Sequence, residues 1–279
     1  HNDKILIIAD NIAKLYAINI NTGKLLWSKK NNAPFNSQVK IYKDKIYVVD
    51  FENTLKAYSI NDGKEIWARK TQGSLIRSQK RLSLVILNEK IYFNNSLGDI
   101  SAVDINNGNL IWQTPTQSSL TFDTGFFLKT SDVVADKGEL FFSNNQNQFF
   151  SLDIQTGNLN WKQEINSNLR PIIINDFIFT ISLEGYLIII EKETGNIIRS
   201  NYLFNKFKIK NRPKLKPTGF IVGKKNIYLS TNIGRLIVID IATGGTKTIL
   251  KIDKKKISRP AIFNKNLYLI TDNSIIKLN

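Results

Sequence analysis

The sequence feature that most constrains this chain is one phrase that recurs six times. Each copy holds an alternating apolar run, a polar turn with a glycine and a second apolar run, which ends in Trp in the first four copies. A spacing of about 40 to 50 residues between copies fits four short strands, so the repeat predicts a β-propeller. The turn glycines, which lie 40, 45, 49, 38 and 49 residues apart, are Gly23, Gly63, Gly108, Gly157, Gly195 and Gly244.

The third copy shows why the phrase indicates a strand, a turn and a strand. In residues 100–105 the side chains are expected to alternate between the two faces of a strand, and Asn106-Asn107-Gly108 supplies the residues that a tight hairpin requires. Other β-rich runs precede each phrase, and several of these follow a short apolar stretch opened by Pro, as at 170–174. We therefore expect an all-β fold, a β-propeller of four-stranded antiparallel blades.

The two ends of the chain bear on the number of blades. The first phrase follows a single run, 4–8, which looks like a second strand, whereas 274–278 looks like a third strand. Two strands are then missing from seven blades, so we expect residues 1–279 to form a single propeller domain that lacks an N-terminal closing segment. Eight blades, with one lost upstream, is the alternative. Because the chain ends on a closing strand, we expect a natural C-terminus there.

The repeat resembles that of the PQQ-like (quinoprotein-type) propellers. Ala102-Val-Asp-Ile-Asn-Asn-Gly-Asn-Leu-Ile-Trp112 matches the family pattern Ala-x-Asp-x-x-Thr-Gly-x-x-x-Trp with Asn in place of Thr. The resemblance covers essentially the whole chain and implies the propeller fold. It leaves two functions open, since the family contains quinone-dependent dehydrogenases, which hold a cofactor and Ca²⁺ in the central channel, and non-enzymatic scaffolds.

The residues argue against catalysis. The chain has no Cys, and its one His is His1, which excludes a Cys nucleophile and argues against a Ser-His triad or a His metal site. The recurring acids Asp104, Asp153 and Asp240 stand beside turns, where Asp bonds local backbone N–H groups. We predict a non-enzyme without a cofactor or metal. The four tryptophans, which we expect to be buried between blades, are Trp27, Trp67, Trp112 and Trp161.

The charge of the chain is strongly basic and clustered. Lys and Arg total 39 against 23 acids, a net charge of +16, and residues 205–217 hold six basic residues and no acid. A second cluster lies at 251–259. Such a surface could meet anionic lipid headgroups or an acidic protein; no aromatic-basic motif indicates nucleic acid. The alternative is a compositional bias. The candidate basic surface is Lys206, Lys208, Lys210, Arg212, Lys214 and Lys216.

One long connection, 113–132, is a candidate for partner binding. Four of its apolar residues are candidate anchors that are either exposed or packed as a cluster under the ring, namely Leu120, Phe122, Phe126 and Phe127. Within the family, the chain is most similar to outer-membrane assembly lipoproteins of the BamB type. Proteins of this type bind their partner through a Leu-x-Leu-Arg element. In this chain the last pair of that element is matched by Leu169-Arg170, which lies in the connection after 113–132.

The resemblance implies a monomeric, non-enzymatic periplasmic scaffold that binds a protein partner in outer-membrane β-barrel assembly. It would be held at the membrane by a lipid on an upstream Cys that this sequence does not include. The alternatives are an extracytoplasmic ligand-sensing propeller and a quinone-dependent dehydrogenase. The expected C-terminus at 278 favours the scaffold over a sensor that continues into a transmembrane helix.

Overall fold

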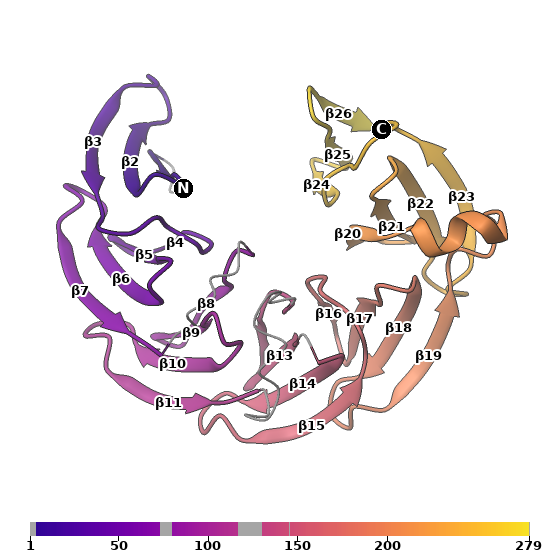
Figure 1. Cartoon of the computed structure of the whole chain (residues 1–279), viewed down its shortest axis with the longest axis horizontal. Helices are drawn as coiled ribbons and strands as arrows, with labels where there is room; N and C mark the ends of the chain where they lie inside the picture. The colour runs from indigo at the N-terminus through magenta and orange to yellow at the C-terminus, as the bar shows by residue number, and fades with distance from the viewer. Residues whose placement is uncertain (1–3, 73–79, 117–129, 145, 279) are drawn as a thin grey trace. The chain divides into compact units, whose positions relative to one another are not determined.

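The described strands of this chain form seven antiparallel sheets (Figure 1). The computed structural model describes residues 4–72, 80–116, 130–144 and 146–278. Within these ranges there is no α-helix, and one 3₁₀-helix, η2, spans Ile209–Lys214. The all-β class and the seven blades expected from the repeat are confirmed.

The first and last sheets have three described strands each, and the five sheets between them have four. The N-terminal closing segment expected from the sequence stays a prediction. In the first three sheets the strands are β1 (Ile5–Ala9), β2 (Lys14–Asn19), β3 (Leu25–Lys30); β4 (Lys40–Tyr42), β5 (Lys45–Val49), β6 (Thr54–Ser59), β7 (Glu65–Lys70); β8 (Leu84–Leu87), β9 (Lys90–Asn94), β10 (Ile100–Asp104) and β11 (Leu110–Thr114).

In the next three sheets a first strand is followed by two central strands and an outer strand, and the last sheet has three described strands. Their strands are β12 (Val134–Asp136), β13 (Glu139–Ser143), β14 (Gln148–Asp153), β15 (Leu159–Glu164); β16 (Ile172–Ile174), β17 (Phe177–Ile181), β18 (Tyr186–Glu191), β19 (Ile197–Tyr202); β20 (Pro217–Val222), β21 (Asn226–Thr231), β22 (Arg235–Asp240), β23 (Thr246–Lys251); β24 (Ala261–Phe263), β25 (Asn266–Ile270) and β26 (Ile275–Leu278).

The chain divides into two compact units. The first comprises His1–Leu140, Asn144–Gln146 and Leu152–Asn160, and the second comprises Phe141–Ser143, Asn147–Ser151 and Trp161–Asn279. Each unit has its own hydrophobic clusters, in which the central strands are almost completely buried. The single domain expected from the sequence stays a prediction.

The outer strands of the first four sheets each contact the turn of the next sheet through a tryptophan. Trp67 on β7 donates from its indole Nε1 to the carbonyl oxygen of Ile105 at 3.2 Å. Its ring lies so close to Gly108 that a Cβ there would be 2.5 Å from Trp67 Cε3. The turn glycine, at φ +70°, therefore makes room for the indole as well as for the left-handed backbone. The same contact joins three further pairs, Trp27 with Gly63, Trp112 with Gly157 and Trp161 with Gly195.

The four indoles are largely buried, as predicted, with part of each ring open to solvent. The outer strands are exposed along much of their length, as in β7, so solvent reaches one side of each ring. The rings still pack between successive sheets, as predicted. Their Nε1–H groups donate to the carbonyl oxygens of Ile60, Ile105, Ile154 and Lys192.

In the fifth repeat an arginine takes the place of the tryptophan. Arg199 pairs with Ile189 on β18, the register position that Trp112 holds opposite Ala102. Its Nη1 donates to the carbonyl oxygen of Ala242 at 2.7 Å and to that of Ile241 at 3.4 Å, in the turn before Gly244. The hydrogen bond to the next sheet is thus kept although the indole is lost.

Replacing Gly108 by Ala tests this contact. Gly23 has nearly the same φ, +69°, but no described atom lies within 4 Å of a Cβ there. We expect Gly23→Ala to lose about 1–2 kcal/mol of unfolding free energy from backbone strain alone. Gly108→Ala should lose about 1–3 kcal/mol more from overlap with Trp67. Urea denaturation of both variants measures the difference, and equal losses would contradict the indole contact.

Candidate interaction surface

The four apolar residues Leu120, Phe122, Phe126 and Phe127 lie outside the described residues. Their role in partner binding stays a prediction from sequence. The other predicted pair is described. Leu169 is 7% exposed and packs in a cluster with Phe179 and Leu187, whereas Arg170 is exposed. Of this pair only Arg170 is presented at the surface, because the leucine belongs to the core.

The basic connection between β19 and β20 is anchored at both ends by buried hydrophobic residues. Phe204 and Leu215, one at each end, are buried in the same cluster as Phe220. Phe207 packs edge-on against Phe204 with 6.0 Å between ring centroids. These contacts fix both ends of the segment on the sheet β20–β23, so the 3₁₀-helix between them has a defined position.

Arg212 is turned into this connection rather than out of it. Its Nε donates to the carbonyl oxygen of Phe207 at 3.0 Å and its Nη2 to that of Asn205 at 2.7 Å. The guanidinium also lies 5.9 Å from the centre of the Tyr202 ring. Arg212 therefore holds the loop together, although the sequence placed it with the surface lysines.

The lysines of the segment point to solvent. All five lysines are exposed, namely Lys206, Lys208, Lys210, Lys214 and Lys216. Among their ammonium groups, only that of Lys206 has a described hydrogen bond, to the carbonyl oxygen of Lys247 at 3.0 Å. Within the ranges that the structure describes, none of the five forms an ion pair. The structure thus brings the predicted basic residues together as one exposed surface, apart from Arg212.

The recurring aspartates accept hydrogen bonds from the backbone of their own turns. The Asp104 carboxylate accepts the backbone N–H groups of Asn106 and Asn107 at 2.8 and 3.2 Å. Asp153 does the same for Gln155 and Thr156 at 3.0 and 2.7 Å. The Thr156 hydroxyl also donates to the Asp153 carboxylate at 2.7 Å, and this bond, together with the backbone bonds, holds the pKa of Asp153 below its ordinary value. The acids are local caps of hairpins, as the sequence predicted, and not a catalytic set.

Asp240 adds an ion pair to its turn. Lys247 Nζ lies 2.6 Å from its Oδ2, and the backbone N–H of Thr243 donates to its Oδ1 at 2.9 Å. The lysine, together with the turn N–H, lowers the pKa of Asp240 to about 2.

Acid should therefore weaken the fold through Asp240. Between its ordinary pKa near 4 and the lowered value, the folded state binds fewer protons than the unfolded state. The carboxylate stabilises the fold above about pH 4, and that contribution is lost as the pH falls through 2. We expect Asp240→Asn to show a smaller drop in Tm than the parent chain between pH 5 and pH 2. An Asn is compatible with this turn, because Asn19 accepts the equivalent backbone N–H groups in the first repeat. An equal drop in Tm for Asp240→Asn and the parent chain would contradict the role of the Asp240 carboxylate.

One polar cluster was missed by the sequence reasoning. It lies before the inner strands β4, β8 and β12, where Gln38 Nε2 donates to Asp132 Oδ2 at 3.0 Å and Lys80 lies close to the same carboxylate. Burial lowers the pKa of Lys80 to about 8, and Asp132 partly opposes that shift. None of the three residues belongs to the repeated phrase, so no spacing marks them.

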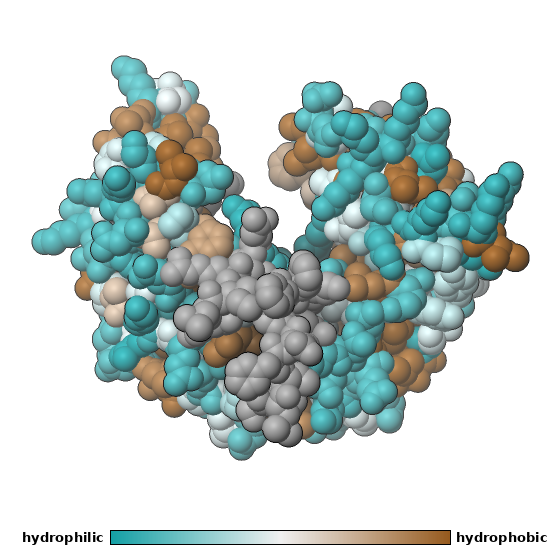
Figure 2. All heavy atoms as spheres, viewed as in Figure 1, coloured by the Kyte–Doolittle hydropathy of each residue, from teal (hydrophilic) through white to brown (hydrophobic). Residues whose placement is uncertain are grey.

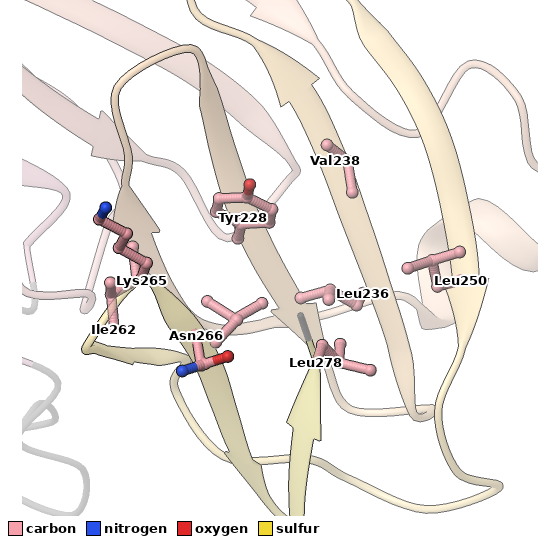
Figure 3. A pocket seen from close by; sticks show the side chains of 9 residues that line it. Tyr228, Leu236, Val238, Leu250, Ile262, Lys265, Asn266 and Leu278 are labelled. Atoms are coloured by element: carbon pink, nitrogen blue, oxygen red, sulfur yellow. The ribbon is translucent and has the colours of Figure 1, made fainter.

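A pocket of about 150 Å³ lies in the second unit between the last two sheets (Figure 3). Its lining is mainly hydrophobic, and it contains neither an acid nor a His. Within the described residues no group of His, Cys, Asp or Glu could hold a metal ion. The titratable side chains of its lining are those of Tyr228 and Lys265. It is lined by Tyr228, Leu236, Val238, Leu250, Ile262, Lys265, Asn266, Leu267 and Leu278.

Residues 2–201 match the family model described as outer membrane protein assembly factor BamB. No curated protein sequence matches the chain. Among solved structures, BamB from Moraxella catarrhalis is similar with a TM-score of 0.83 at 16% identity, over 98% of this chain and 81% of that one.

Two further solved structures share the fold. Quinohemoprotein alcohol dehydrogenase from Comamonas testosteroni has a TM-score of 0.70 at 13% identity, over 96% of this chain and 62% of the enzyme. The computationally designed Ika8 protein has a TM-score of 0.61 at 12% identity, over 99% of this chain and 93% of its own. At these identities the likeness concerns the fold.

Proposed function

Because this chain belongs to the family of the outer membrane protein assembly factor BamB, we propose that it is a non-enzymatic scaffold in outer-membrane β-barrel assembly. In this role it binds a protein partner at the periplasmic face of the outer membrane. The observation that carries the proposal is the family match over residues 2–201, supported by the BamB-like fold over 98% of the chain.

Membrane attachment is a separate part of the proposal. Within the described residues, no helix has both the length and the apolar character that a membrane crossing requires. We propose attachment through a lipid on a Cys upstream of His1, as the resemblance implies. The lipid would keep the scaffold close to the membrane in which its partner works.

The proposed partner surface lies on the connections that join one sheet to the next. Arg170 is exposed just before the inner strand β16, on a connection whose position is fixed by the buried Leu169. From sequence, the apolar anchors are Phe122 and Phe126 in the longer connection. Exposed arginines and aromatics are the residues that carry most binding energy in protein interfaces.

Affinity capture of the full-length protein from its own membranes tests the scaffold. We expect it to recover the barrel-assembly protein of the outer membrane, and we expect Phe122→Ala with Phe126→Ala to lose this capture. Phe263→Ala is the control, because Phe263 is 67% exposed on β24 and outside the proposed surface. Loss of capture with Phe263→Ala, or retention with the double variant, would contradict the proposed surface.

A quinone-dependent dehydrogenase is the second candidate, since two quinohemoprotein alcohol dehydrogenases share the fold. The described residues do not fit a quinone and Ca²⁺ site. The four indoles are engaged in contacts between sheets, and Asp104, Asp153 and Asp240 accept backbone N–H groups.

Thermal unfolding with added PQQ and Ca²⁺ separates the two functions. A ligand at a hundred times its Kd stabilises a protein by about 2.7 kcal/mol, which is readily seen as a rise in Tm. We expect no rise and no dye-linked alcohol oxidation. A rise in Tm at a stoichiometric amount of PQQ would instead support the dehydrogenase.

A further inference from the structure

We propose that the connection 205–216 is a membrane-contact element that binds a phospholipid surface with anionic headgroups. In this arrangement Ile209 enters the boundary of the acyl chains while the surrounding lysines contact lipid phosphates. The inference is independent of the protein partner proposed above, since it rests on a different segment and on its own observations.

The first observation is an isolated apolar side chain at an exposed position. Ile209 is 78% exposed, more than any other large hydrophobic residue in the described ranges. It begins η2, which Figure 1 draws outside the sheet β20–β23. In that region the surface view shows hydrophobic and hydrophilic residues side by side (Figure 2). Exposure of this kind is unfavourable in water, and a bilayer boundary would remove it.

The second observation is the charge around that side chain. Lys208 and Lys210 flank Ile209 directly, and Lys206, Lys214 and Lys216 complete a run of exposed lysines without an acid between 205 and 217. Basic residues next to an anionic membrane surface are attracted to it. Lysine also suits headgroups that present no fixed geometry, because its ammonium acts as a point charge.

The third observation is that the segment is already ordered. Asn232 accepts the backbone N–H of Lys216 at 2.8 Å and donates to the carbonyl oxygen of Lys214 at 3.0 Å. Arg212 bonds two carbonyl oxygens within the loop, and Phe204 and Leu215 anchor its ends. Ile209 and the lysines are therefore presented together without a folding step, which lowers the entropic cost of binding.

These features favour a lipid surface over an acidic protein or a nucleic acid. A protein interface has a core of several apolar side chains, whereas this segment exposes Ile209 and surrounds it with charge. Single-stranded nucleic acids stack their bases on exposed aromatics. Phe207, the aromatic residue of the segment, is instead packed against Phe204.

Sedimentation with lipid vesicles tests the proposal. The 279-residue chain is mixed with vesicles of phosphatidylcholine alone or with 30% phosphatidylglycerol, at low and high salt. We expect binding to the anionic vesicles only, weakened by salt. We expect Ile209→Ser to reduce the partition coefficient roughly tenfold. The triple variant Lys208→Gln, Lys210→Gln, Lys214→Gln should remove the preference for phosphatidylglycerol.

Two matched controls make the result specific. Ile12→Ser changes another exposed isoleucine, 65% exposed, and Lys251→Gln with Lys254→Gln and Lys256→Gln removes the same charge from the second basic cluster. Both controls should bind nearly as well as the parent chain, and Tm should be unchanged in all variants. No binding to anionic vesicles, equal loss in the controls, or undiminished binding of the Ile209 and lysine variants would each overturn the proposal. So would capture of an acidic protein through these residues with no lipid binding.

Discussion

The contact between an outer strand and the next turn is the interaction on which the rest of the structure depends. A four-stranded sheet cannot bury both of its faces alone, so each sheet needs a neighbour. Trp67 supplies this link by donating to Ile105 and by covering Gly108, where no side chain fits. Because each link joins only adjacent repeats, the stability of the array is distributed over many similar contacts. A repeat survives the loss of its indole when another donor reaches the same carbonyl, as Arg199 does.

Much of the fold could be predicted because its determinants are local. A run of residues with high β propensity places the strand β5, and Asn106-Asn107-Gly108 places the turn after β10. The caps by Asp104 and Asp153 could also be predicted, since each carboxylate bonds residues two and three positions further on. The part of each indole that stays open to solvent could not be predicted, because it depends on where the outer strand lies in three dimensions.

The parts that the sequence missed depend on contacts between distant residues. Gln38, Lys80 and Asp132 precede three different strands, and only the packing of those inner strands brings them together. Leu169 and Arg170 are neighbours in sequence, yet one is in the core and the other is exposed. The six basic residues at 206–216 look equivalent in sequence. The structure separates Arg212, which bonds the loop's own carbonyl groups, from the lysines that face solvent.

This division limits where function can lie. The residues that define the repeat are engaged by the fold, since the indoles and turn aspartates all have structural partners. Segments that differ from one repeat to the next do not make these contacts between and within sheets. The connection after β19 is an example, because it exposes Ile209 and several lysines. An apolar side chain surrounded by cations complements a surface that is anionic and apolar at its boundary, which is the chemistry of a phospholipid bilayer.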